Sequence, residues 1–175
     1  MEEEDFELLR KYFKPKQYFK GDFLVKGDET CDEVLFIAEG YFQVFVLNDI
    51  EENTIHIAGN GDFITALSSF ISRAPSDEYV QSITDSNGLA INYQDLQTLY
   101  DHSKSWERLG RFVMENLFVR KQKRVISFIK DSAELRYEHL LLNTPELLQH
   151  IPLRILASYI GVKPETLSRI RAKIS

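Results

Sequence analysis

The stretch "VLFIAEGYFQVFVL", residues 34–47, decides the fold because it has the pattern of two short β-strands joined by a turn. It is rich in Val, Phe and Tyr, which favour strands. Phe42, Val44 and Val46 stand at alternate positions, as expected of a strand with one buried face. Gly40 lies between the two apolar runs, where a tight turn favours a residue without a Cβ. The centre of this sequence is therefore predicted to be β-structure.

The same pattern extends over residues 18–93. The segments "NTIHIAG" (residues 53–59) and "YVQSIT" (residues 79–84) are also short and partly alternating. Glycines separate these runs at intervals typical of turns: Gly21, Gly27, Gly40, Gly59, Gly61 and Gly88. Many short strands with regular turns are typical of a sandwich or a jelly roll, and we predict that architecture here.

After Tyr93 the apolar period changes to 3.6 residues, which predicts helices. A short helix over residues 93–102 is followed by one from Ser105 to about Lys130, roughly 38 Å long. One small domain does not need a helix of this length, so the same helix of a second copy is the simplest partner for its far side. The alternative is a helix packed wholly within its own chain. The apolar residues that recur along it are Leu109, Phe112, Val113, Leu117, Val119, Ile126 and Ile129.

The end of the chain, "IPLRILASYIGVKPETLSRIRAKIS" (residues 151–175), predicts two helices joined by a tight turn. Pro152 suits the first turn of one helix, Gly161 the left-handed residue at its end, and Pro164 the start of the next. Ala157 is small enough for two helices to cross closely. The apolar seam between them consists of Leu156, Ile160, Val162, Leu167 and Ile170. This is the helix-turn-helix pattern.

We place the domain boundary near Asp131. It divides the chain into residues 1–131, which include the long helix, and an all-helical unit over residues 132–175. The predicted fold class is α+β, because strands and helices occupy separate parts of the sequence.

Charge is distributed unevenly. The net charge of the chain is −6, but residues 151–175 hold five basic residues and one acidic residue, a net charge of +4. The rest of the chain carries −10. An acidic body with a short basic end is expected when only that end approaches a polyanion such as DNA, and a solvated basic helix is the alternative.

The second helix of the pair carries side chains suited to DNA. Glu165 can accept a hydrogen bond from cytosine N4, and Arg169, one turn later, can donate two to guanine. The flanking residues suit phosphate contacts: Lys163, Thr166, Ser168, Arg171 and Lys173. Because helix-turn-helix pairs also occur in proteins that bind no nucleic acid, the alternative is a ligand-binding or interaction module.

Other classes of protein find little support in the composition. The single Cys31 excludes an internal disulfide and an iron–sulfur cluster, and it favours a reducing cytoplasm. No apolar run approaches the ~20 residues that cross a membrane. The four histidines lack metal-ligand spacing, and no nucleophile lies beside a base. We therefore expect no metal, no cofactor and no enzymatic activity.

The whole chain resembles the CRP/FNR family of bacterial transcription regulators. The resemblance rests on the glycine frame "FLVKGDETCDEVLFIAEGYFQVF" (residues 23–45), on "GDF" (residues 61–63), and on "GVKPETLSRIRAKI" (residues 161–174). It implies a double-stranded β-helix, or β-roll, as sensor domain, a dimerisation helix over about residues 105–130, and a C-terminal DNA-binding domain. It also implies a homodimer on a palindromic operator, and RNA polymerase as a further partner of an activator.

The loop "GDFITALSSFISRAPSDEYV", residues 61–80, departs from the family members that bind cyclic AMP. Those members place a Glu and an Arg where this sequence has Ala66 and Ser76. Arg73 would take the arginine position only if the loop were three residues shorter. A buried phosphate without a cation costs several kcal/mol, so we expect no cyclic AMP binding and an unknown effector. The resemblance places the effector pocket at Thr65, Ala66, Leu67, Ser68, Arg73, Ser76 and Asp77.

The tail departs from the family in two further ways. Pro164 occupies a position where relatives often carry a DNA-contacting Arg, so the operator is expected to differ. The sequence ends at Ser175 without the β-hairpin wing of many relatives, which is expected to affect affinity more than function.

Overall fold

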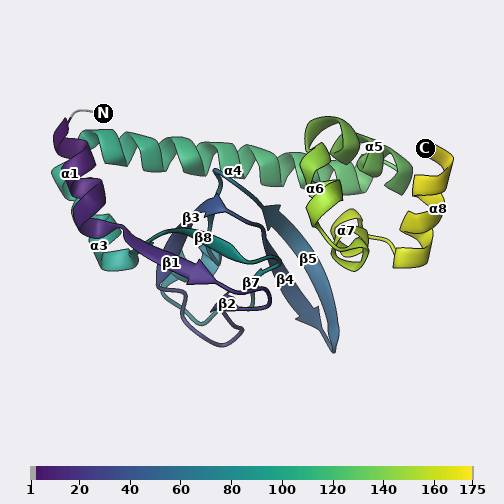
Figure 1. Cartoon of the computed structure of the whole chain (residues 1–175), viewed down its shortest axis with the longest axis horizontal. Coiled ribbons are helices and arrows are strands. Elements are labelled where there is room, and N and C mark those ends of the chain that lie inside the picture. The colour runs from purple at the N-terminus through teal and green to yellow at the C-terminus, as the bar shows by residue number, and fades with distance from the viewer. Residues whose placement is uncertain (1–2, 175) are drawn as a thin grey trace.

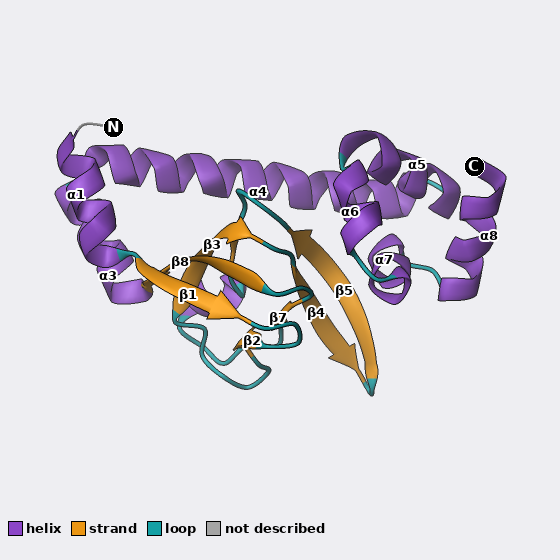
Figure 2. Ribbon diagram, viewed as in Figure 1, coloured by secondary structure: helices purple, strands orange, loops and turns teal. Residues whose placement is uncertain are grey.

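The N-terminal half of the chain is a β-roll of two antiparallel sheets (Figures 1 and 2). The computed structural model describes residues 3–174. The strand order is β1-β8-β3-β6 in one four-stranded sheet and β2-β7-β4-β5 in the other. The strands are β1 (Lys14–Tyr18), β2 (Phe23–Val25), β3 (Glu33–Glu39), β4 (Phe42–Asn48), β5 (Glu51–Ala58), β6 (Phe63–Ile64), β7 (Tyr79–Ser82) and β8 (Ser86–Asn92). Their shared core includes Leu35, Ile37, Phe42, Val44 and Val80. The jelly-roll-like prediction is confirmed.

The turn at Gly40 shows why this stretch decides the fold. Strand β3 belongs to one sheet and β4 to the other, so the chain crosses between the sheets here. Gly40 has φ +109°, and a Cβ at this position would overlap with Ser86. Only glycine adopts this conformation without strain, and only glycine leaves room for the neighbouring strand.

Eight helices complete residues 3–174. They are α1 (Glu3–Tyr12), α2 (Leu67–Ser72), α3 (Tyr93–His102), α4 (Lys104–Lys130), α5 (Ala133–Asn143), α6 (Pro145–His150), α7 (Leu153–Ile160) and α8 (Pro164–Ile174). The side chains of Asn92, Ser103 and Ser132 cap α3, α4 and α5, which explains where these helices begin. The long helix is confirmed, and Figure 1 shows that α4 runs across the β-roll from α1 to the C-terminal helices.

Helix α1 fixes the first turn of α4. The indole Nε1 of Trp106 donates a hydrogen bond to the carbonyl oxygen of Asp5 (3.3 Å), and Ser103 Oγ donates one to Asp5 Oδ1 (2.6 Å). The rings of Phe13 and Trp106 lie 5.5 Å apart. These contacts bury the side chain of Asp5, whereas Glu3, Glu4 and Glu7 on the same helix stay exposed.

The C-terminal helices share a core with the β-roll. Tyr41, Ile57 and Ile83 of the roll pack in one cluster with residues of α5–α8. Helix α7 lies against β5, which is an edge strand of its sheet. Ser158 Oγ accepts a hydrogen bond from the Thr54 N–H (2.8 Å) and donates one to the Glu52 carbonyl (3.0 Å). This β5–α7 contact satisfies two backbone groups that an edge strand would otherwise leave unpaired.

Candidate nucleic-acid interface and effector cavity

Helices α7 and α8 are joined by the tight turn that the sequence predicted. Gly161 has φ +82°, and its N–H donates a hydrogen bond to the carbonyl of Ala157 (2.9 Å). Pro164 then begins α8. Ala157 is fully buried where the helices meet, in one core with the apolar residues Leu156, Ile160, Leu167 and Ile170. The seam therefore fixes which side of α8 faces outward.

The outward side of α8 carries the predicted DNA-contacting residues. Arg169 Nε lies 3.4 Å from the carbonyl oxygen of Glu165, so the two residues are one turn apart on an exposed face. Thr166 is half-buried, whereas the other predicted residues are exposed: Lys163, Ser168, Arg171 and Lys173. Lys173 Nζ lies 3.6 Å from a carboxylate oxygen of Glu134. In Figure 1, α8 lies at the end of the molecule farthest from α1.

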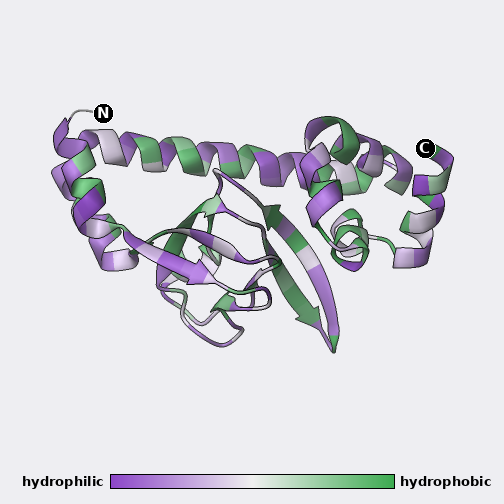
Figure 3. Ribbon diagram, viewed as in Figure 1, coloured by the Kyte–Doolittle hydropathy of each residue, from purple (hydrophilic) through white to green (hydrophobic). Residues whose placement is uncertain are grey.

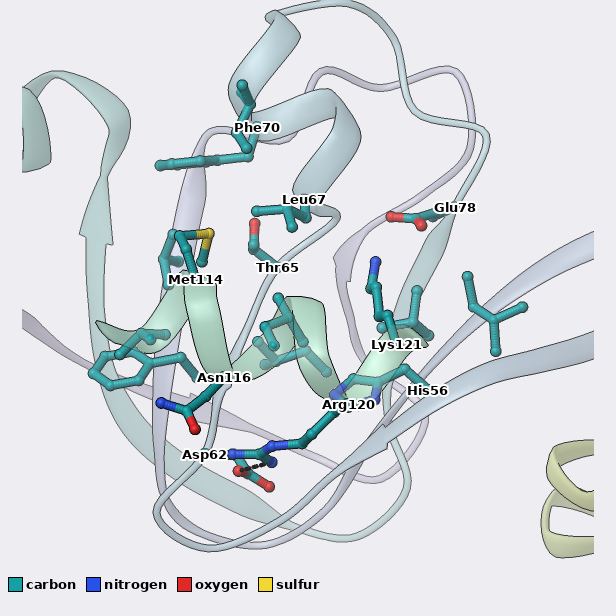
Figure 4. A pocket seen from close by; sticks show the side chains of 18 of the residues that line it. His56, Asp62, Thr65, Leu67, Phe70, Glu78, Met114, Asn116, Arg120 and Lys121 are labelled. Carbon is teal, nitrogen blue, oxygen red and sulfur yellow. Dashed lines mark hydrogen bonds and ion pairs between the residues drawn. The ribbon is translucent and has the colours of Figure 1, made fainter. Parts of the chain in front are cut away.

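A cavity of about 1230 Å³ lies between α4 and the β-roll. Its apolar wall includes Leu67 and Phe70 from α2 and Val113, Met114 and Leu117 from α4. The other end is charged (Figure 4), and the side chains there come from β5, the β6 and β7 approaches, and α4: His56, Asp62, Glu78, Arg120 and Lys121. The cavity between α4 and the β-roll therefore has an apolar part and a charged part.

The structure brings only two of the seven predicted pocket residues to this cavity, Thr65 and Leu67. Thr65 Oγ1 donates a hydrogen bond to the carbonyl of Glu33 (2.9 Å), so its hydroxyl is already used by the fold. Ala66, Ser68, Arg73, Ser76 and Asp77 are not among the lining residues. His56, Arg120 and Lys121 were not predicted from the sequence as residues of this site. The basic run "RKQKR" on α4 (residues 120–124) was a signal for Arg120 and Lys121, but not for His56.

In the loop of residues 61–80, the positions singled out for a cyclic phosphate are all engaged by the fold. Ala66 is completely buried at the start of α2, and Ser76 is buried with its hydroxyl bonded to the Glu78 backbone N–H (3.0 Å) and carbonyl (2.8 Å). Arg73 ends α2 with φ +60° and donates a hydrogen bond to the Cys31 carbonyl (2.9 Å). Its guanidinium also pairs with Asp32 and stacks 4.3 Å over the Tyr93 ring. Arg73 is therefore committed to packing this loop.

Two titratable groups at the charged end have shifted pKa values. Burial, reinforced by the nearby cations Lys121, Arg120 and Arg124, lowers the pKa of His56 to about 4, although Asp62 opposes the shift. Burial also raises the pKa of Glu78, which Lys121 partly opposes. The imidazole is therefore neutral at pH 7, and the Glu78 carboxyl group lies at the same end of the cavity as Arg120 and Lys121.

Arg124 connects this end of the cavity to the C-terminal helices. Its guanidinium donates hydrogen bonds to the carbonyls of Tyr159 (2.7 Å) and Thr54 (3.3 Å). It lies 3.9 Å over the Tyr159 ring and 4.6 Å over that of Phe128. One side chain of α4 thus joins β5 and α7, beside the hydrogen bonds of Ser158.

Two kinds of site are absent from the part of the chain that the structure describes. No group of three or more His, Cys, Asp or Glu side chains within residues 3–174 is placed to hold a metal ion. Nor does any helix in that range combine the length and the hydropathy needed to cross a membrane.

Comparison with known proteins places this geometry in context. Residues 15–103 match the family of the cyclic nucleotide-binding domain. FixK2 from Bradyrhizobium japonicum has a similar structure, with a TM-score of 0.81 and 16% identity over 93% of this chain and 84% of that one. CLP, described as a c-di-GMP-responsive global regulator of Xanthomonas campestris, has a TM-score of 0.75 and 17% identity over 99% and 91%. No curated protein sequence matches the chain.

Proposed function

Because the chain belongs to the cyclic nucleotide-binding domain family and has the fold of the CRP/FNR regulators, we propose that it is a homodimeric, DNA-binding transcription regulator that does not respond to cyclic AMP. In this proposal residues 1–131 form the sensor domain and dimerisation helix, and residues 132–175 form the DNA-binding domain. The protein acts in the cytoplasm, and RNA polymerase is its further partner if it activates transcription.

The observation that carries the proposal is the outer face of α8. Glu165 and Arg169 are exposed one turn apart, and the apolar seam holds the opposite side of the helix against α7. An α-helix fits the major groove of DNA, where a carboxylate can read cytosine and an arginine can read guanine. Exposed Lys163 and Lys173 supply the phosphate contacts that give such an interface most of its affinity.

The outer face of α4 supports the homodimer. Phe112, Phe118 and Ile129 are 62%, 64% and 79% exposed, and Figure 3 shows hydrophobic residues along the length of this helix. An apolar strip of this size on one helix marks a protein interface. Of the residues predicted for the interface, Val119 lies on this face, and Phe112 lies at its edge, exposed but also lining the cavity. Leu109 instead packs against the Trp106 cluster, and Val113 and Leu117 line the cavity of their own chain.

The contacts within the loop of residues 61–80 support the proposed absence of a cyclic AMP response. Neither Ala66 nor Ser76 offers a group to a phosphate, and Arg73 is held by Asp32 and Tyr93. A second candidate function is an interaction module that binds no DNA. The net charge of −6 favours it, because most of the surface then repels a polyanion.

Selection from random duplex DNA by the full chain tests the proposal. We expect enrichment of a palindrome with half-sites about one helical turn apart, as a two-fold dimer requires. Recovery of unrelated sequences at low salt only, or of none, would support the interaction module instead. The matched control is the chain with Arg169→Ala, which we expect to lose the enriched sequence while keeping its fold.

A further inference from the structure

A second, smaller cavity of about 340 Å³ lies between the β-roll, α4 and the C-terminal helices. The roll contributes Tyr41 and Ile57 to its wall, and α5 and α6 contribute Leu140 and Leu147. These four side chains are buried and belong to the core that the two parts of the chain share. Sites for small molecules have volumes of roughly 300–1,000 Å³ and mostly apolar walls. A molecule held in this cavity therefore contacts the β-roll and the C-terminal helices at once.

Arg124 also lines this cavity, as a half-buried cation whose hydrogen bonds go to neutral groups. Its Nη2 group donates to the carbonyls of Tyr159 (2.7 Å) and Thr54 (3.3 Å). No carboxylate within residues 3–174 forms an ion pair with it. Burial lowers the pKa of Arg124, and Arg136 reinforces the shift, although Tyr159 opposes it. A charge that is partly buried without an opposite charge is costly, and it indicates a site where an anion binds.

The charges around the cavity leave an excess of one positive charge. Its wall has three cations, Arg120, Lys121 and Arg124, and two carboxylates, Asp62 and Glu146. Arg120 Nη1 lies 3.0 Å from Asp62 Oδ1, so this pair cancels. Glu146 is exposed on α6, whereas Arg124 is half-buried, so solvent screens the carboxylate more than the guanidinium. One negative charge beside Arg124 would complete the balance.

We propose that this cavity binds a small organic monocarboxylate with a compact apolar body, and that the carboxylate pairs with Arg124. Because both bonds from Arg124 to carbonyls come from Nη2, the Nη1 donors remain for the carboxylate. A carboxylate adds the attraction of opposite charges to such a hydrogen bond, which a neutral carbonyl does not. The apolar body packs among Tyr41, Ile57 and Leu147. The binding goes beyond the proposed function, and only a role of the ligand as effector of DNA binding would rest on it.

Calorimetric titration of the full chain at pH 7, without DNA, tests the binding. The probes are phenylacetate and isovalerate, which combine a carboxylate with a compact apolar body. Acetate retains the charge without the body, and phenylacetamide and isovaleramide retain the body without the charge. We expect at least one of the two acids to bind tenfold or more tightly than its amide and than acetate. If neither acid binds at ~10 mM, or if the amides bind as tightly as the acids, the proposal is wrong.

Arg124→Gln tests the cation. We expect it to weaken binding of the acid at least tenfold, whereas Lys123→Gln, which removes an exposed charge from the neighbouring position on α4, should change it less than twofold. Because Arg124 also joins β5 to α7, its variant can lose stability together with the ligand. Glu146→Gln avoids this difficulty, because Glu146 is exposed. It removes a like charge from the wall, so the acid should bind at least twofold more tightly.

Glu78→Gln is the matched control that identifies the cavity. Arg124 lines both cavities, but Glu146 lines only the smaller one and Glu78 only the larger one. We expect Glu78→Gln to leave the dissociation constant of the acid unchanged. If Glu78→Gln tightens binding and Glu146→Gln does not, the ligand lies between α4 and the β-roll, and the proposal is overturned. None of these titrations depends on DNA, so a failed selection of operator DNA would refute the proposed function and leave their result standing.

Discussion

Helix α8 and the loop of residues 61–80 both have a backbone suited to meeting phosphate, but they differ in the charges that they present. Helix α8 exposes Arg169 on its outer face, and Lys163, in the turn just before the helix, is also exposed. The loop buries Ala66 and Ser76 and holds Arg73 against Asp32. The comparison shows that the frame of a site and its binding chemistry are separable, because different forces maintain them.

The loop keeps its frame because packing requires it. Gly61 has φ +83°, and its N–H donates a hydrogen bond to the Ile37 carbonyl (2.8 Å), which fixes the approach to β6. Ser69 Oγ accepts from the Cys31 N–H (2.9 Å) and donates to the Ala74 carbonyl (2.5 Å). None of these contacts involves a ligand. The β-roll can therefore keep this loop after its anion-binding side chains are replaced.

We expect the largest effect on DNA affinity from a change at Arg169, so this residue gives the strongest test of the contrast between α8 and the loop. Replacing Arg169 with Ala removes a bidentate base contact worth about 1–3 kcal/mol in each half-site, and the dimer carries the change twice. Affinity for the selected operator should therefore fall roughly 30-fold or more, as measured by titration at fixed salt.

Lys163→Ala is the matched control for Arg169→Ala. It should weaken operator and scrambled DNA alike and reduce the slope of log affinity against log salt. If Arg169→Ala also weakens binding to both DNAs equally, Arg169 contacts only phosphate. Helix α8 and the loop would then differ only in the net charge that they expose.

The sequence predicted those parts of both regions whose signals are local. Gly161 and Pro164 locate the turn before α8, and the change of apolar period locates α4. It did not separate the two faces of α4, because periodicity cannot tell whether Val113 meets its own β-roll or a second copy. Helix α2 was also missed, since no side chain caps it. The sequence did not reveal the charged end of the cavity, because its residues come from four separate segments: β5, the turns before β6 and β7, and α4.

Ser158→Ala tests whether the β5–α7 contact joins the β-roll to the C-terminal helices that carry α8. The change leaves the buried N–H of Thr54 without its acceptor, which costs about 1–3 kcal/mol. The free energy of unfolding in urea should fall by that amount, and the Thr54 amide should exchange its hydrogen faster. Ser168→Ala, on the exposed face of α8, should change stability by less than about 0.5 kcal/mol. Equal effects of the two changes would mean that the β5–α7 contact contributes nothing in solution.

His56→Gln tests the electrostatics of the cavity at a smaller scale. Burial lowers the pKa of His56 to about 4, so between that value and about 6.5 the unfolded chain binds a proton that the folded chain does not. The contribution of neutral His56 to stability is therefore complete above pH 6.5 and is lost as the pH falls toward 4. Because solvent reaches part of the ring, we expect wild type to lose only about 1 kcal/mol more than His56→Gln between pH 7 and pH 5. Parallel pH profiles in urea unfolding would show that His56 is solvated.

The smallest expected effect is that of cyclic AMP, which should leave the melting temperature unchanged. A ligand at a hundred times its dissociation constant adds about 2.7 kcal/mol to the stability of the folded state. In a chain of this length, that would raise the melting temperature by roughly 5–10 °C. We expect no such rise at millimolar cyclic AMP, with AMP as the control, because the loop offers no free cation and Glu78 faces the cavity. A rise with cyclic AMP that AMP does not give, and that Arg73→Ala abolishes, would mean that Arg73 leaves Asp32 to bind the phosphate. The loop and α8 would then both offer an arginine to phosphate. They would differ only in that Arg73 must first leave Asp32, whereas Arg169 is already exposed.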